Sequence, residues 1–259
     1  MRCHATALVA ALAALLTFPI DAAAQLKVLM SGGFSGPYER LVADFERSSG
    51  VKVATASGAS QGTGPQTIRA QLAAGAQADV VILSREGLAE LVAAGRIAAG
   101  TETDLARTPL GIAVRAGAPK VDVGTVESFK RVVTSAKRVA APGSTSGIFV
   151  RDQVLPRLGI ADQVRLQTTP RGAEAAAMVA AGEADLAIMP VSEIVHAPGV
   201  ELGGVLAEEI QLHQVFAAAV VAGSSQPDAA KRLIAFLASK DAAAAIRSGG
   251  MDPIGARRP

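Results

Sequence analysis

Hydrophobic residues in the first third of the chain follow two different spacings. Short continuous apolar runs at 26–30 and 80–83 predict buried strands. Between them, apolar side chains at i, i+3, i+4 and i+7 predict a helix over 38–48 that ends at Gly50. The pattern continues with a strand at 51–55, a helix with Ile68 and Leu72 inward, and a helix with Leu88, Leu91 and Val92 inward.

The alternation of strands and helices extends through the rest of the chain. It predicts an α/β fold in two units, with ligands at the carboxyl ends of the strands. We expect the last helices to return to the first unit, so that two chain crossings form a hinge. The predicted strands lie at 110–115, 138–141, 165–168, 186–189 and 215–221, and the predicted helices at 126–133, 148–158, 174–181, 227–239 and 241–247.

Two helix–strand junctions have similar sequences. The segment 73–79 (AAGAQAD) precedes the strand at 80–83, and the segment 180–185 (AAGEAD) precedes the strand at 186–189. Each combines a helix stop, a short turn and an aspartate. The similarity fits either the common chemistry of αβ loops or pseudo-symmetry between the two units.

Three turns rich in glycine and hydroxyl side chains connect predicted strands to helices, at 31–36, 57–66 and 142–147. Free backbone N–H groups at a helix start carry partial positive charge and suit an anion. Ordinary turns and caps use the same residue types, and Thr63 with Gln66 has capping-box spacing. On the binding interpretation, the ligand contacts are Ser31, Gly32, Gly33, Ser60, Gln61, Thr63, Ser144, Thr145 and Ser146.

Four arginines could supply a cationic contact. Arg69 and Arg85 follow predicted strand ends in the first unit, and a guanidinium in the cleft would pair bidentately with a carboxylate. Arg151 and Arg171 are comparable candidates in the second unit. The competing interpretation is that these arginines are solvated on helix surfaces.

The first 24 residues have the features of a secretory signal peptide. Arg2 is followed by an apolar run at 5–20 and by small residues that end at Ala24. The competing interpretation is an uncleaved anchor. Cys3, the only cysteine, lies in this segment without a lipobox, so we expect no disulfide and no lipid attachment in the secreted chain.

Composition and motifs exclude several functional classes. The net charge of +2 arises from 25 basic and 23 acidic residues without a basic block, so we expect no nucleic-acid partner. His196 and His213 have no metal-ligand spacing, so we expect no metal site and no cofactor. A hydrolase oxyanion hole at residues 31–33 would need a His–Asp partnership, which the sequence does not indicate.

The order of these features resembles the periplasmic molybdate-binding-protein family, the type 2 solute-binding proteins of ABC transporters. The resemblance covers residues 26–255. It includes the small-residue turn after the first strand, the Pro-Gly-Ser turn at 142–144, the AAGEAD junction and the segment 235–243 (AFLASKDAA).

The resemblance implies a two-lobed clamshell that closes on an anion, with a central mixed, mostly parallel sheet in each lobe. Lobe 1 would comprise 25–108 and 217–259, and lobe 2 would comprise 109–216. The resemblance also implies that the protein acts as a monomer in the periplasm. There it would deliver a small anion to an inner-membrane ABC permease.

The chain departs from the family pattern at several ligand positions. Gly33 occupies the place of the family's first ligand serine, with Ser31 two residues earlier. The second ligand loop is lengthened at 62–66. Pro190 replaces a family tyrosine, and Ser192-Glu193 replaces a Ser-Asp pair, which adds Ser192 to the candidate contacts. These departures favour an organic carboxylate over a tetrahedral oxyanion, and both stay candidate ligands.

Two functions follow from the resemblance. The first, which we favour from the sequence, is a binding protein without chemistry. The second is a periplasmic aconitate isomerase, since one branch of the family moves a double bond in a tricarboxylate by proton transfer. That reaction needs a general base, for which the sequence offers Glu193, Tyr38 or a histidine and does not single out one.

Overall fold

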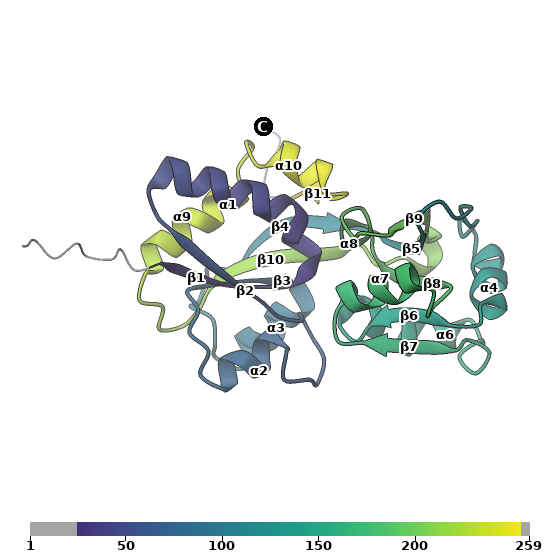
Figure 1. The fold of residues 1–259 in the computed structure, drawn as a ribbon. Coiled ribbons are helices and arrows are strands. Elements are labelled where there is room, and N and C mark those ends of the chain that lie inside the picture. The colour runs from purple at the N-terminus through teal and green to yellow at the C-terminus, as the bar shows by residue number, and fades with distance from the viewer. Residues whose placement is uncertain (1–24, 255–259) are drawn as a thin grey trace, which may run out of the picture.

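The computed structural model describes residues 25–254, which form two lobes side by side (Figure 1). The predicted signal peptide lies outside these residues. Each lobe contains one mixed sheet with helices on both faces, which confirms the α/β clamshell architecture. Within 25–254, none of the helices is long and apolar enough to cross a membrane.

The first lobe is built on a six-stranded sheet with the order β11-β4-β10-β3-β1-β2. Strands β1, β2, β3 and β4 run in one direction, and β10 and β11 run in the other. The strands are β1 (Leu26–Met30), β2 (Val53–Ser57), β3 (Val80–Ser84), β4 (Thr103–Thr108), β10 (Gln214–Val220) and β11 (Asp252–Pro253). The helices are η1 (Gly32–Phe34), α1 (Ser35–Ser49), α2 (Ile68–Ala73), α3 (Arg85–Ala93), α9 (Pro227–Leu237) and α10 (Ala243–Ser248).

The second lobe is built on a five-stranded sheet with the order β7-β6-β8-β5-β9, in which only β5 runs against the others. Both sheets are therefore mixed and mostly parallel in strand direction. The strands are β5 (Leu110–Arg115), β6 (Val139–Pro142), β7 (Leu166–Thr169), β8 (Leu186–Pro190) and β9 (Val200–Val205). The helices are α4 (Val126–Ser135), α5 (Thr145–Phe149), the π-helical turn η2 (Val150–Val154), α6 (Leu155–Arg157), α7 (Gly172–Ala181), α8 (Val191–Ile194) and η3 (Glu208–Ile210).

The chain crosses between the lobes twice, once between β4 and β5 and once between η3 and β10. The second crossing corrects the boundary that we expected at residue 217. Gln214 and Phe216 already pair with Thr108 and Ala106 of β4, because β10 begins before its continuous apolar run. The tail returns to the first lobe as expected, and β11 pairs with β4.

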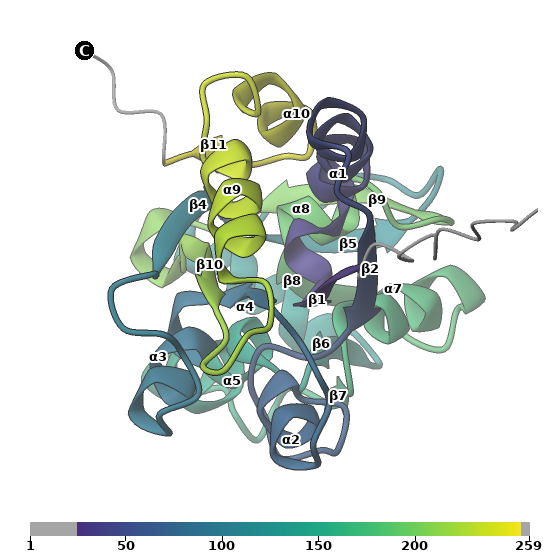
Figure 2. The same cartoon turned by 90° about the vertical axis from the view of Figure 1, so that its left-hand side faces the viewer.

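Aliphatic side chains fill the space on both faces of each sheet. In the first lobe, α1, α9 and α10 cover one face and α2 and α3 cover the other (Figure 2). In the second lobe, α4 and α6 lie over a cluster that contains Phe129, and α7 packs alanines against the opposite face. The predominance of Ala, Val, Leu and Ile explains why the core needs few aromatic rings.

The two lobes share one strand order. In the first lobe β4-β10-β3-β1-β2 corresponds to β9-β5-β8-β6-β7 in the second. The similar junctions occupy equivalent places: Asp79 precedes β3 and accepts the Lys27 N–H at the start of β1, and Asp185 precedes β8 and accepts the Arg138 N–H beside β6. This agreement favours pseudo-symmetry over coincidental loop chemistry.

Some local predictions were wrong because tertiary pairing overrides a weak pattern. Strands β4, β9 and β11 lack a continuous apolar run and were not predicted. The helix α2 begins after Thr67, whose hydroxyl accepts the Ala70 N–H, so the proposed capping box of Thr63 and Gln66 does not form. Val92 is exposed, since α3 turns that side to solvent.

We predict that Asp79→Ala lowers the free energy of unfolding by about 1 to 3 kcal/mol, because it removes a buried acceptor and leaves two part-buried donors unpaired. The Asp79 carboxylate accepts the Lys27 N–H at 2.8 Å and the Ser224 hydroxyl at 2.7 Å. Urea unfolding measures the effect. Asp44→Ala, which removes an exposed ion pair with Arg47, is the control and should change the value by less than about 0.5 kcal/mol. Equal effects of the two substitutions would contradict the prediction.

Candidate functional site

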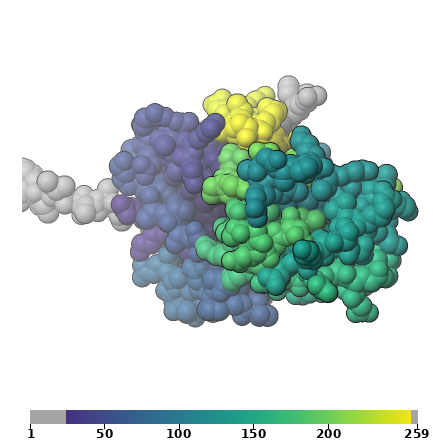
Figure 3. Space-filling model, turned by 45° about the vertical axis from the view of Figure 1, so that its right-hand side comes forward, coloured from purple at the N-terminus to yellow at the C-terminus, as the bar shows by residue number. Residues whose placement is uncertain are grey.

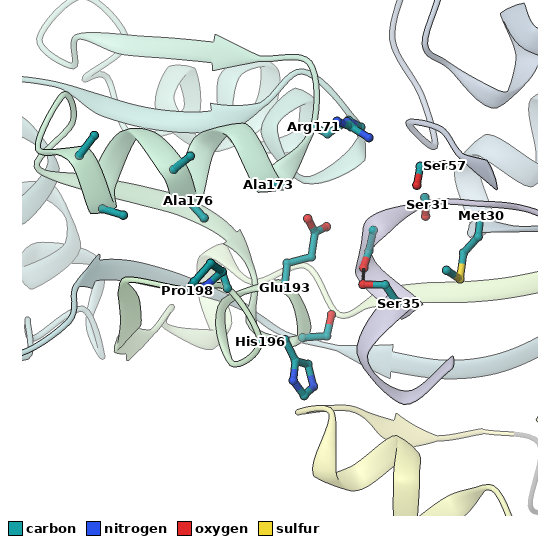
Figure 4. Close-up of a pocket in the computed structure, with 16 residues that line it drawn as sticks. Met30, Ser31, Ser35, Ser57, Arg171, Ala173, Ala176, Glu193, His196 and Pro198 are labelled. Carbon is teal, nitrogen blue, oxygen red and sulfur yellow. Dashed lines mark hydrogen bonds between the residues drawn. The ribbon is translucent and has the colours of Figure 1, made fainter. Parts of the chain in front are cut away.

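Two adjoining cavities lie between the lobes, at the carboxyl ends of β1, β6 and β7, and Figure 4 shows the larger one. The larger one, the outer chamber, has a volume of about 640 Å³, and the smaller one, the inner pocket, has about 20 Å³. Ser31, Gly32, Arg171 and Glu193 line both. The outer chamber adds Met30, Ser35, Ser57, Ser192, His196, Ala197, Pro198 and five alanines of α7, and the inner pocket adds Gly58, Ala59, Ser60, Pro142, Ser144, Ser146, Gly172, Gln214 and Phe216.

Three buried polar atoms at these cavities have no hydrogen-bond partner among the described residues. They are the hydroxyls of Ser31 and Ser192 and the side-chain oxygen of Gln214. Ser31 lines both cavities, Ser192 the outer chamber and Gln214 the inner pocket. Because an unpaired buried polar atom costs free energy, such a group at a cavity wall indicates a place for a bound polar molecule.

Glu193 lies in the first turn of α8, and its carboxylate reaches the contact between the lobes. A Cβ on Gly172 would lie 1.8 Å from Glu193 Oε2, and a Cβ on Gly32 would lie 3.3 Å from it. Gly172 is the first residue of α7 and Gly32 the first of η1. The carboxylate thus lies between one glycine from each lobe, and a side chain at position 172 would displace it.

The surroundings of Glu193 adjust its acidity. Burial raises the pKa of Glu193 to about 7; the negative charge of Glu174 also raises it, and the Arg171 guanidinium opposes the rise. A carboxyl group with a pKa near neutrality can both accept and return a proton under physiological conditions. Among the candidate bases of the sequence analysis, Glu193 is the one that borders both cavities.

Tyr38 does not fit the role of base. It is buried in the first lobe, its hydroxyl bonds to Thr55 Oγ1 at 2.8 Å, and it lines neither cavity. Burial raises the pKa of Tyr38 to about 12, so that the phenol keeps its proton near neutral pH. His196 lines the outer chamber, whereas His213 contacts Glu208 away from both cavities.

Of the four arginine candidates, only Arg171 lines the cavities. Its Nη2 lies 2.7 Å from Glu174 Oε1. The other three make ion pairs elsewhere, because their helices turn them toward acidic neighbours within a lobe. Arg69 pairs with Glu90, Arg85 with Asp104 and Arg151 with Asp152, and these placements correct the expectation that Arg69 or Arg85 faces the cleft.

Several predicted ligand residues instead bond to each other across the lobes. Thr145 donates to Gln61 Oε1 at 2.8 Å and lies 2.7 Å from the Ser84 hydroxyl. The Gln61 N–H donates to the Ser144 hydroxyl at 3.1 Å. We call these four residues, Gln61, Ser84, Ser144 and Thr145, the inter-lobe latch. It holds the lobes together in the arrangement that Figure 3 shows.

The remaining predicted contacts divide between cavity and framework. Ser60 and Ser146 line the inner pocket, and Ser60 Oγ also accepts the Ser84 N–H at 2.9 Å. Thr63 is exposed and lines neither cavity. Gly33 also lines neither cavity. A Cβ at this position would lie 1.9 Å from the Phe216 ring, so the glycine is needed for packing.

The sequence analysis did not single out Gln214 or the alanine face of α7. Gln214 is a lone polar residue at the start of the apolar run of β10, and it is almost fully buried. The signal available in the sequence was a single glutamine at the start of an otherwise apolar strand. The alanines gave none, because alanine is common on helices of every kind. Residues 25–254 contain no group of three or more metal-ligating side chains that could hold an ion.

Comparison with known proteins is consistent with this architecture. The family model described as "Bacterial extracellular solute-binding protein" matches residues 26–252. The chain belongs to this family. A curated relative of this solute-binding protein is an aconitate isomerase from Pseudomonas sp, which is 36% identical over 233 residues, covering 90% of this chain and 89% of the relative.

Solved structures share the fold of this solute-binding protein at low sequence identity. The periplasmic molybdate-binding protein of Azotobacter vinelandii superimposes with a TM-score of 0.69 at 20% identity, covering 88% of this chain and 98% of that one. The sulfate-binding protein SubI of Mycobacterium tuberculosis H37Rv gives a TM-score of 0.69 at 19% identity, with 89% and 87% covered. These structures confirm the two-lobed fold.

We predict that Thr145→Val opens the lobes in a larger fraction of molecules. The substitution keeps the shape of the side chain but leaves Ser84 and Gln61 without their shared partner, at a cost of about 1 to 3 kcal/mol to the closed form. Small-angle X-ray scattering should show a larger radius of gyration. Thr134→Val on α4, whose hydroxyl bonds only to its own helix, is the control. An unchanged radius in Thr145→Val would show that the latch does not hold the lobes.

We predict that Glu193→Gln becomes more stable relative to the parent protein as the pH rises from 5 to 8. The pKa of Glu193 is raised from 4.5 to about 7 in the folded state, so the folded protein binds more protons than the unfolded chain in this window. The parent protein therefore loses stability as the pH rises through the folded pKa. Melting temperatures of both proteins across the window measure the effect. The exposed substitution Glu201→Gln should not alter the pH dependence.

Proposed function

We propose that this solute-binding protein takes a small organic polycarboxylate into the cleft and shifts its double bond by proton transfer, as an aconitate isomerase does. The observation that carries the proposal is the Glu193 carboxylate, enclosed between Gly172 and Gly32 with a pKa near neutrality. An ionised carboxylate at this place would repel a captured anion, because like charges repel, whereas proton transfer makes direct use of it.

The relation to the Pseudomonas enzyme supports this proposal. The aconitate isomerase is 36% identical and matches nearly the whole chain, which supports a common fold. The identity alone does not decide the activity, because function resides in the site. The site of this chain adds the general base that the reaction requires.

The reaction needs one proton and no change of oxidation state. The Glu193 carboxylate removes a proton from the methylene carbon next to a ligand carboxylate. The C–H electron pair then forms the new double bond, and the old double bond yields its electrons to its far carbon. Glu193 returns the proton to that carbon, so that atoms and charge balance.

The surroundings of Glu193 suit the charge that develops on the ligand. Arg171 can exchange Glu174 for a ligand carboxylate, which a guanidinium binds bidentately. The N-terminus of α7, ten residues long, adds partial positive charge beside the same position. Ser31, Ser192 and Gln214 offer the polar atoms that lack partners. Together these groups can hold two carboxylates of the ligand with the reactive carbon near Glu193.

The second candidate function is capture of a carboxylate without chemistry, for delivery to an inner-membrane ABC permease. The unpartnered hydroxyls of Ser31 and Ser192 favour binding in either case. Membership in the extracellular solute-binding family supports action outside the cytoplasm, and we infer the periplasm as the compartment. A monomer is the form in which we expect the protein to act.

We predict that the protein converts trans-aconitate to the cis isomer and that Glu193→Gln lowers kcat/KM at least 100-fold. Because the base must be deprotonated, kcat/KM should rise with pH and level off above about 7. Proton NMR of the substrate measures turnover, and in D₂O it detects deuterium at the methylene carbon. Glu201→Gln, an exposed change on β9, should retain the parent rate.

A thermal-shift series with molybdate, sulfate, di- and tricarboxylates separates the two functions. Stabilisation by a carboxylate without turnover would replace the isomerase by the capture function. The series reports binding because a ligand that binds the folded state raises its apparent stability. Stabilisation by molybdate or sulfate alone would contradict both carboxylate proposals.

A further inference from the structure

The outer chamber has an apolar wall that the isomerase chemistry does not use. It consists of Ala173, Ala176, Ala177, Ala180 and Ala181, which follow one face of α7 and line the chamber (Figure 4). These side chains offer neither a hydrogen bond nor a charge. Their methyl groups leave a channel along the helix, where larger side chains would fill the space.

Two buried hydroxyls show that this chamber is shaped for a ligand. Ser31 and Ser192 have exposed fractions of 4% and 2%, line the chamber, and have no hydrogen-bond partner among the described residues. A polar group or a water molecule at the edge of the chamber would supply their missing partners, because an unpaired buried hydroxyl is costly. The apolar wall and these hydroxyls thus face a common space from α7 and from the opposite side.

The sizes of the two cavities limit which part of a ligand each cavity can hold. The inner pocket, at about 20 Å³, has room for about one water molecule, and so for one oxygen atom of a carboxylate. The outer chamber, at about 640 Å³, is in the range of cavities that enclose organic molecules larger than a six-carbon acid. Glu193 and Arg171 border both.

We propose that the ligand is an alkyl-substituted polycarboxylate, which places one carboxylate at the inner pocket and its alkyl branch along the alanine face of α7. The inference rests on the proposed function for the carboxylate and adds the alkyl branch. Methylene groups gain from contact with the alanine methyls, while the second carboxylate meets Ser31, Ser192 and Arg171. The carbon that carries the branch then lies beside Glu193.

The test measures binding of succinate, butylsuccinate and octylsuccinate to the full-length mature protein by isothermal titration calorimetry. Each methylene that the chamber buries should tighten binding by up to about fourfold. In Ala177→Leu, the added side chain occupies the channel. The ratio of the butylsuccinate affinity to the succinate affinity should then fall at least tenfold. Ala235→Leu, an exposed alanine on α9, is the matched control and should keep the parent ratio.

The outcomes separate this inference from the isomerase proposal. Equal affinity for succinate and butylsuccinate in the parent protein overturns the inference, as does failure of every succinate to bind. A preference for butylsuccinate that Ala177→Leu leaves intact also overturns it, because the alkyl group then lies elsewhere. Tight, chain-length-dependent binding without aconitate turnover supports the inference and overturns the isomerase function instead.

Discussion

The enclosure of the Glu193 carboxylate between the two lobes is the constraint on which the rest of the site depends. A buried carboxylate must be paired, hydrogen-bonded or protonated, since its desolvation is costly. Here Gly172 of one lobe and Gly32 of the other leave just enough room for it, and Glu174 and Arg171 adjust its charge. Glu193 and Gly172 belong to the same lobe, so separation of the lobes would remove the Gly32 side of this enclosure and expose the carboxylate to more water.

The inter-lobe latch explains why some polar residues of the turns that the sequence highlights bond across the lobes, while others from the same turns, such as Ser31 and Ser60, line the cavities. Gln61, Ser144 and Thr145 satisfy one another's hydrogen bonds together with Ser84, and so they are committed to closure. The polar atoms left without partners at the cavities come from both lobes, Ser31 and Gln214 from the first and Ser192 from α8 of the second. One cleft thus divides its hydroxyl groups between holding the lobes together and meeting a ligand.

The elements that were predictable are those whose residues contact near neighbours in the sequence. The apolar runs of β1, β3 and β8 and the spacing of α1 report local structure directly. Strands β4, β9 and β11 escaped prediction because their residues are strand-forming only through partners far along the chain, as Asp252 is through Arg107. The boundary at β10 was misplaced for the same reason.

The sequence by itself determined the α/β architecture, the turns at the strand ends and the candidates Ser31, Glu193 and Arg171, because strand and helix periodicity and turn chemistry act over a few residues. Only the tertiary structure decided which candidates share a cavity. Arg69 and Arg171 have the same side chain, yet Arg69 pairs with Glu90 while Arg171 faces the cleft. The direction of a side chain depends on the rotation of its helix against the sheet, and packing far along the chain sets that rotation.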